Sequence, residues 1–163
     1  MADMLVKLYA LEDEDLFVSR YQDNGIIIKQ AYRGDKHIIM DFIKKNFDAN
    51  LWPNECERAM NNDPVSCFIA VKEKKLIGFS CYDGTTRGFF GPIGVKEEYR
   101  KHGIGGFLLK RTLFAMREYG YAYAVIGWAD PDAFSFYKRY AGAEVIEGSS
   151  NEKSAYRNMI TCE

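Results

Sequence analysis

Apolar residues recur along this sequence at two spacings, and each spacing predicts one kind of element. Between Asp35 and Phe47 they follow the helical spacing, with Asp35 placed to cap the helix. The same spacing predicts helices over Pro53–Asn61, Gly103–Tyr119 and Asp132–Tyr140. Gly120 follows the longest of these helices, where a glycine can end a helix in the left-handed conformation.

Shorter apolar runs bounded by turn residues predict strands. The expected strands are Leu5–Leu11, Gly25–Tyr32, Val65–Lys72, Lys75–Asp83, Gly88–Val95, Ala122–Trp128, Ala143–Ile146 and Ala155–Thr161. The run Ala122–Trp128 is continuously apolar, which is typical of a strand buried on both faces. Strands and helices in this order predict a mixed α/β sheet, and 163 residues are the length of one domain.

The charge balance argues against polyanionic partners. With 22 basic and 23 acidic side chains the net charge is -1, so neither nucleic acid nor an anionic membrane surface is expected to bind. No run approaches the roughly 20 apolar residues of a membrane span, and the N-terminus lacks the pattern of a signal peptide. We therefore expect a soluble protein of the cytoplasm.

The cysteines do not follow the spacing of a metal site. Cys56, Cys67, Cys81 and Cys162 form no Cys-x-x-Cys pair, and the sequence has only two histidines. We therefore expect reduced thiols and no metal. Cys67 and Cys81 are expected to be buried on adjacent strands, and no histidine is placed to make either of them a nucleophile.

A glycine-rich segment precedes the longest predicted helix. Arg100–Gly105 fits the pattern Arg-x-x-Gly-x-Gly between a strand and a helix, and Gly106 follows it. Glycines let the backbone approach a ligand closely, and the first amides of a helix lack internal acceptors and favour an anion. These residues alone leave two interpretations open, an anion site or only a tight turn.

Other nucleotide-binding motifs fit this segment less well. A dinucleotide fingerprint needs a third glycine where Leu108 stands, and the Gly-Lys-Ser/Thr of a P-loop does not occur. Pro92 in the preceding strand cannot donate a hydrogen bond to a sheet ladder. The strand Gly88–Val95 is therefore expected to be irregular near Pro92 and to leave backbone groups free for a ligand.

Two segments together resemble the GNAT superfamily of N-acetyltransferases. Residues 91–105 resemble its motif A, and Asp130–Lys138 resembles the Asn-x-x-Ala-x-x-x-Tyr segment after its fifth strand. The resemblance implies a largely antiparallel, twisted sheet of about seven strands with about four flanking helices, in which the fourth and fifth strands splay apart. It extends from about Gly25 to the end, so residues 1–24 are expected to be an N-terminal extension of a single domain over residues 1–163.

The resemblance also implies acetyl-CoA as the acetyl donor, with no metal. The pantetheine arm would pair with the backbone of Ile93, Gly94 and Val95, and an amide of that strand would face the thioester carbonyl. The pyrophosphate would lie at the loop of Arg100, Lys101, His102, Gly103, Ile104, Gly105 and Gly106. Asp130 stands where the family usually has asparagine, which puts the usual hydrogen bonds to the cofactor arm in doubt.

Acetyl transfer by direct attack of an amine is helped by a proton donor and a proton acceptor. Tyr137 matches the usual acid of the family at the CoA sulfur, and the alternative is that its ring only packs. For the proton acceptor the candidates are Asp83 and Glu55, which could also be ordinary solvated carboxylates, and relatives often use a water chain instead.

Aromatic residues are the candidates for the acceptor side of the site. Trp52, Tyr82, Phe90 and Trp128 could line a cleft there, and each could equally belong to the core. The sequence thus predicts an N-acetyltransferase for a primary amine of a small molecule or peptide. A domain that senses acetyl-CoA without catalysis is the alternative, and a homodimer stays open.

Overall fold

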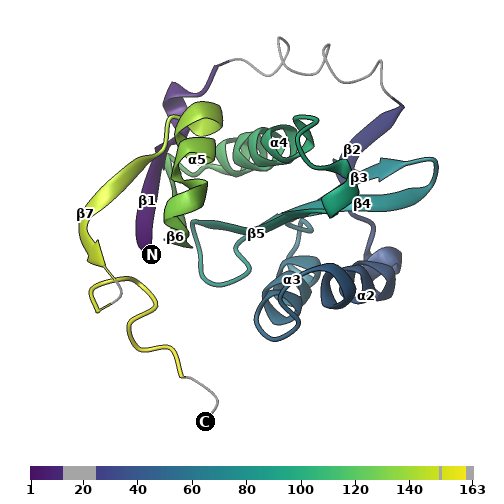
Figure 1. Cartoon of the computed structure of the whole chain (residues 1–163), viewed down its shortest axis with the longest axis horizontal. Helices are drawn as coiled ribbons and strands as arrows, with labels where there is room; N and C mark the ends of the chain where they lie inside the picture. Colours follow the sequence, from purple (N-terminus) through teal and green to yellow (C-terminus); the bar gives the residue numbers. More distant parts are fainter. Residues whose placement is uncertain (13–24, 151, 161–163) are drawn as a thin grey trace.

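The computed structural model describes residues 1–12, 25–150 and 152–160, and its main element is a seven-stranded sheet (Figure 1). The strands are β1 (Ala2–Lys7), β2 (Ile26–Gln30), β3 (Cys67–Lys72), β4 (Lys75–Tyr82), β5 (Phe89–Val95), β6 (Tyr123–Ala129) and β7 (Glu144–Ser150). Their order is β2-β3-β4-β5-β6-β1-β7, and every neighbouring pair is antiparallel except β5 with β6. The predicted fold class is confirmed.

In the described part of the chain, four α-helices cover the sheet on both faces. They are α2 (Lys36–Asn46), α3 (Trp52–Asn61), α4 (Ile104–Tyr119) and α5 (Phe134–Ala141). Figure 1 shows α4 and α5 on one face and α2 and α3 on the other. Gly120 ends α4 at a φ of 113°, as expected, whereas the expected cap by Asp35 is wrong because its side chain makes no capping hydrogen bond. Asp35 instead ends a short 3-10 turn that leads directly into α2.

The two layers of helices create two apolar clusters. Leu108, Leu109 and Leu113 of α4 are fully buried against one face of the sheet. Ile39 and Ile43 of α2 are buried with Phe79 of β4 on the other face. Burial of each such side chain contributes about 1.5–3 kcal/mol relative to exposure. Because helices cover both faces, a ligand site is expected where two strands separate rather than on an open face of the sheet.

The N-terminal strand lies inside the sheet rather than outside the domain. β1 pairs with β6 on one side and β7 on the other, and Met4 and Val6 are fully buried. The expected N-terminal extension is therefore wrong for residues 2–7, while residues 13–24 lie outside the described part of the chain. The strand also differs from the predicted Leu5–Leu11. It begins earlier, at Ala2, and it ends at Lys7 because residues 8–10 form a 3-10 turn.

The expected last strand at Ala155–Thr161 is also wrong within the described residues. Residues 152–159 form turns with short-range hydrogen bonds, such as the one from Met159 N–H to the Tyr156 carbonyl at 2.9 Å. The physical reason is that the Asp3 carboxylate binds the Ala155 N–H and the Ser154 hydroxyl, so a side chain holds this segment instead of a strand ladder.

Strand β6 differs from the expected strand buried on both faces. Ala124 and Ile126 are buried against α4, whereas Tyr123 is 48% exposed and Val125 is only half-buried. The outer face of β6 is therefore only partly covered, although its sequence is continuously apolar. The C-terminal segment packs on this face through Tyr156.

The carboxylate of Asp3 joins three distant parts of the chain. This residue is 4% exposed, and its side chain accepts hydrogen bonds from the backbone N–H groups of Trp128 at 2.9 Å and Ala155 at 3.0 Å. The Ser154 hydroxyl adds a third contact at 3.3 Å. Since a buried carboxylate needs such donors, Asp3 fixes β1, the end of β6 and the C-terminal segment together.

We expect Asp3→Ala to lower the free energy of unfolding by about 2–4 kcal/mol, because it leaves buried N–H groups without acceptors. Urea denaturation measures this change. Lys7→Ala on the same strand is the control, because its ion pair with Glu144 is exposed and is expected to contribute less than about 1 kcal/mol. Equal effects of the two substitutions would show that Asp3 does not hold these segments together.

Candidate functional site

Strands β5 and β6 part after only two residue pairs. Phe89 pairs with Val125 and Phe90 with Ile126, and no further pair joins these strands in the described part of the chain. On its other side β5 stays paired with β4 as far as Val95. The backbone edge of β5 beyond Phe90 is thus free to hydrogen-bond a ligand. This is the splay that the resemblance implied, at the strands numbered β5 and β6 here.

Pro92 lies where the strands part. The register of β4 against β5 shifts between Ser80 and Tyr82, opposite Gly91 and Pro92, and Gly91 has a φ of 120° that favours glycine. The irregularity expected near Pro92 is therefore confirmed.

Helix α4 begins with amides that have no acceptor inside the helix. Gly103 precedes it in the left-handed conformation with a φ of 78°, and Lys101 has a φ of 67°. The bond from Phe107 N–H to the Gly103 carbonyl, at 3.1 Å, is the first of the helical series. The amides of residues 104–106 therefore lie at the positive end of a 16-residue helix, where an anion is favoured.

The side chains of the loop before α4 divide into two groups. Arg100 Nε donates to the Val95 carbonyl at 3.0 Å and so ties the loop to the end of β5. Lys101 and His102 are exposed beside the helix start. Among the described residues nothing pairs with the Lys101 side chain, so its positive charge adds to that of the start of α4.

The two glycines inside the first turn of α4 differ in their surroundings. A Cβ atom at Gly106 would lie 2.3 Å from a ring carbon of Tyr140, so this glycine lets α5 pack closely against α4. A Cβ atom at Gly105 would lie 3.5 Å from the Phe136 ring, which is an ordinary contact. Gly106 therefore has a packing role in addition to the predicted place beside an anion.

A cleft of about 510 Å³ lies at the separation of β5 and β6. Helix α3 and the segment before it contribute Asp48, Leu51, Trp52 and Glu55, the loop before β5 contributes Thr85, and β5 contributes Phe90, Gly91, Pro92 and Ile93. Residues 126–130, Ala133, Tyr137, Tyr156, Met159 and Met1 complete the lining. Seven residues that the sequence singled out thus meet here: Trp52, Glu55, Phe90, Ile93, Trp128, Asp130 and Tyr137.

Tyr137 reaches the cleft from α5, close to the point where the strands part. Its ring centroid lies 6.4 Å from that of Phe90 and 5.2 Å from that of Phe136. Burial raises the pKa of its phenol to about 12, and the phenol oxygen has no hydrogen-bond partner among the described residues. A protonated phenol without a partner can donate to a ligand atom near β5.

Glu55 forms the end of a hydrogen-bonded chain on the other wall of the cleft. The Thr85 hydroxyl donates to Glu55 Oε1, and the Tyr156 hydroxyl donates to Thr85 Oγ1 at 3.3 Å. Partial burial raises the pKa of the Glu55 carboxyl, and the bond from Thr85 opposes that shift. The two hydrogen bonds thus run in the same direction, from Tyr156 to Thr85 and from Thr85 to the Glu55 carboxylate.

Tyr156 brings the C-terminal segment onto the outer face of β6. Its ring stacks on Trp128 with centroids 4.8 Å apart and meets the edge of Phe89 at 5.9 Å. A Cβ atom at Gly127 would lie 2.1 Å from the Tyr156 ring, so only a glycine allows this contact. The C-terminal segment thereby becomes one wall of the cleft.

Trp128 has two unusual features. Its backbone has a φ of 49°, which is strained for an aromatic residue, and the bond from its N–H to Asp3 holds that conformation. Its indole Nε1 is buried and has no hydrogen-bond partner among the described residues. A buried donor of this kind at a cleft is available to a ligand atom or a water molecule.

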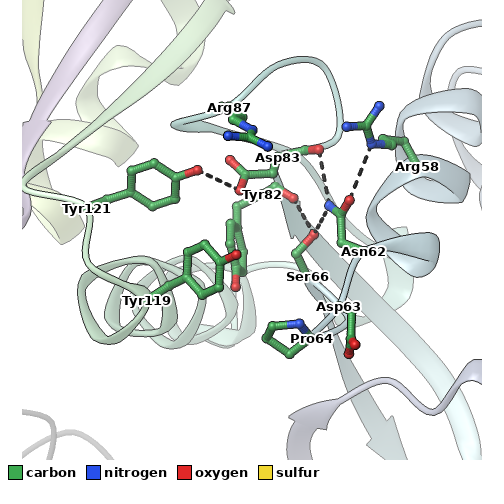
Figure 2. Close-up of a pocket in the computed structure, with 10 residues that line it drawn as sticks. All are labelled: Arg58, Asn62, Asp63, Pro64, Ser66, Tyr82, Asp83, Arg87, Tyr119 and Tyr121. Carbon is green, nitrogen blue, oxygen red and sulfur yellow. Dashed lines mark hydrogen bonds between the residues drawn. The ribbon is translucent and has the colours of Figure 1, made fainter.

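Two predicted site residues, Asp83 and Tyr82, lie at a second cavity of about 230 Å³ (Figure 2). Asp83 accepts hydrogen bonds from Gly88 N–H at 2.7 Å and from the Tyr121 hydroxyl at 2.8 Å, so both carboxylate oxygens are engaged. Figure 2 shows Tyr121 pointing at this carboxylate and Tyr82 lying near Tyr119. Asp83 therefore closes the loop of residues 83–88 and lies outside the cleft that contains Tyr137.

Three cysteines meet in the core below α3. Cys67 and Cys81 are directly paired on β3 and β4 and are fully buried, as expected, and the Cys56 sulfur lies 4.0 Å from that of Cys67. Among the described residues, no other group of at least three Cys, His, Asp or Glu brings its ligand atoms so close. Within the described residues this group offers three ligands, one fewer than the usual tetrahedral zinc site. Burial raises the pKa of the Cys81 thiol well above its ordinary value, which favours the neutral thiol.

The cleft residues that the sequence analysis did not identify include Asp48, Thr85, Gly127 and Tyr156. Thr85 and Gly127 carry no signal of their own, because their roles come from contacts with segments far along the chain. Tyr156 was assigned to a strand. Asp48 begins the turn between two predicted helices, and its place before the acceptor-side Trp52 was the one signal that could have identified it.

Comparison with protein families finds one match. Residues 28–143 match the model of the acetyltransferase (GNAT) family. A search of curated proteins finds no match.

Solved structures share this fold. A GCN5-related glucosamine N-acetyltransferase region in a fungal multi-domain GH3 β-N-acetylglucosaminidase matches with a TM-score of 0.70 and 14% identity, over 89% of this chain and 19% of that one. A GCN5-related N-acetyltransferase from Sphaerobacter thermophilus matches with a TM-score of 0.63 and 18% identity, over 89% and 48% of the two chains. This chain therefore spans about a fifth and about half of their lengths.

A third structure is similar in length. The aminoglycoside acetyltransferase meta-AAC0020 from an uncultured soil metagenomic sample, in complex with trehalose, has a TM-score of 0.53 and 21% identity, over 72% of this chain and 88% of that one. At such identities the likeness establishes the shared fold alone. Among the described residues, no helix has both the length and the apolar character needed to cross a membrane.

The two glycines of the α4 turn give a matched pair of substitutions. We expect Gly106→Ala to lower the free energy of unfolding by about 1–3 kcal/mol, since its methyl group overlaps the Tyr140 ring. Gly105→Ala is expected to be neutral or slightly stabilising, because there is room for its methyl group and alanine favours helices. Thermal denaturation of both variants checks this, and equal stabilities would contradict the packing role of Gly106.

Proposed function

The chain belongs to the acetyltransferase (GNAT) family, and from this we propose that it is an N-acetyltransferase that transfers the acetyl group of acetyl-CoA to a primary amine. The observation that carries the proposal is the separation of β5 and β6 beside the start of α4. It combines a free strand edge with a site for an anion. Glucosamine and aminoglycoside, in the names of two similar structures, are both amines.

We assign the donor side of the site, which would bind acetyl-CoA, to the start of α4 and the free edge of β5. The amides of residues 104–106 would hold the pyrophosphate, with Lys101 adding positive charge. The free edge of β5 at Ile93 and Gly94 would pair with the amides of the pantetheine arm, as an added strand does. Asp130 is committed to the turn after β6, where its carboxylate accepts from Asp132 N–H at 2.9 Å.

The reaction moves one acetyl group and two protons. The amine nitrogen attacks the thioester carbonyl, the carbon–sulfur bond breaks, and the CoA thiolate leaves. The Tyr137 phenol is placed to protonate this thiolate, because its raised pKa keeps it protonated at neutral pH. An N–H donor on the free edge of β5 would stabilise the oxyanion.

Glu55 is the carboxylate we assign to take up the proton of the attacking amine. It shares the cleft with Tyr137, whereas both oxygens of Asp83 are engaged elsewhere. The Thr85 hydroxyl, which itself accepts from Tyr156, donates to Glu55 and so holds this carboxylate at the wall of the cleft. A domain that binds acetyl-CoA without transfer would use the donor side alone and would leave this second wall without a role.

We expect Gly105→Glu to abolish acetyl-CoA binding, because it puts bulk and negative charge at the amides assigned to the pyrophosphate. Isothermal titration calorimetry with acetyl-CoA measures the affinity. Gly105→Ala is the control for folding and is expected to keep its affinity within a few-fold. Normal affinity of the glutamate variant would refute the assignment of the loop.

We expect Tyr137→Phe to lower kcat by about 10- to 1000-fold with unchanged affinity for acetyl-CoA. In the native enzyme the Tyr137 phenol loses its proton only as pH rises through its pKa of about 12. We therefore expect that kcat/KM does not fall between about pH 8 and 10. Release of free CoA with a panel of amines measures both. Unchanged turnover in the variant would remove Tyr137 from the mechanism.

A further inference from the structure

We propose that the acceptor is a diamine or polyamine, which carries a second ammonium group beyond the amine that is acetylated. The inference rests on the proposed function and narrows its acceptor. Three carboxylates line the cleft, those of Asp48, Glu55 and Asp130, and no lysine, arginine or histidine side chain does so among the described residues. The charged side chains of this lining are thus all acidic, although the net charge of the chain is near zero.

Two of these carboxylates stand on the same wall at different depths. Glu55 is half-buried and receives the bond from Thr85, whereas Asp48 is exposed. Glu55 is therefore suited to the reacting amine deep in the cleft. Asp48 is suited to a second ammonium group that keeps part of its hydration.

The backbone holds Asp48 in place. Its Oδ1 accepts from Asn50 N–H at 2.7 Å and from Leu51 N–H at 2.9 Å, so the carboxylate is fixed at the turn before α3. Its Oδ2 has no partner within the described part of the chain and can accept from a ligand. A fixed carboxylate loses little side-chain entropy when it binds a cation, which makes an exposed charge pair more effective than usual.

Aromatic rings form the remaining surface between these charges. Trp52 lies between Asp48 and Glu55 along the chain, and Trp128 with Tyr156 covers the facing side. The cation–π contacts of the described residues use other rings, so these three faces are not occupied by the protein's own cations. Aromatic faces beside carboxylates bind alkylammonium groups while also covering the apolar carbons between them.

The buried Nε1 of Trp128, on the same wall, has no acceptor among the described residues. A buried donor left without an acceptor is costly unless a bound molecule or water supplies one. The nitrogen of a neutral amine, or a hydroxyl on the acceptor, can accept this bond. An acceptor with a carboxylate beyond its amine would instead place like charges near Asp48 and Glu55.

Acetylation of matched amines tests the inference, with free CoA as the readout. Putrescine is compared with n-butylamine and gamma-aminobutyrate, which replace its second ammonium by a methyl group or a carboxylate, and cadaverine with n-pentylamine. We expect kcat/KM about tenfold or more higher for each diamine, with the advantage shrinking as salt is raised because exposed charges are screened. The carboxylate analogue is expected to be the poorest substrate.

Asp48→Asn isolates the charge, because asparagine keeps the oxygen that accepts from Asn50 and Leu51. We expect this variant to raise KM for putrescine about 5- to 20-fold, with little change in kcat and no change for n-butylamine. Asp41→Asn on the exposed face of α2 is the matched control and should change nothing.

The outcomes separate the two proposals. Turnover of n-butylamine as efficient as that of putrescine, or an Asp48→Asn variant with native KM, would overturn the diamine inference and leave the acetyltransferase standing. Absence of CoA release with every amine would overturn the proposed function and the inference with it.

Discussion

Backbone groups in a sheet must find partners, and the parting of β5 from β6 after two residue pairs removes those partners on one edge. The other features of the site follow from this. The loop after β5 places the free amides of α4 beside the opened edge, and α5 brings Tyr137 to the point of separation. The outer face of β6 near Gly127 is open enough for Tyr156 to cover it. If β5 and β6 were paired along their full length, there would be no cleft for the edge of β5, Tyr137 and Tyr156 to line together.

Features that depend on residues close together in sequence could be predicted. The turn before α4, the glycine that ends it and the irregularity at Pro92 each follow from a few neighbouring residues, and the structure confirms them. The two family segments, residues 91–105 and 130–138, also predicted that Tyr137 and Ile93 would share a cleft. Local conformation and motif spacing were therefore sufficient to predict the fold and the separation of β5 from β6.

The acceptor side could not be predicted in the same way. Asp83 was a reasonable base because it ends a strand, but its conformation directs both oxygens to Gly88 and Tyr121. The apolar run of β6 predicted full burial, although only a tyrosine some thirty positions later covers part of its outer face. Pairings over such separations leave no periodic trace in the sequence. That is why Tyr156 was assigned to a strand, although its segment forms turns that are bonded to Asp3.

The insertion of β1 between β6 and β7 has a consequence for the order of folding. The first strand to be synthesised finds its two neighbours only after residues 123–150 exist, and Asp3 gains its full set of donors later still, at Ala155. Contacts across nearly the whole chain slow the search for the native pairing. During synthesis β2, β3, β4 and β5 can already assemble with α2 and α3. The wall of the cleft made by β6 and Tyr156 can form only after these later residues have been made. During synthesis the site can therefore be completed only after residues 123–156 have been made.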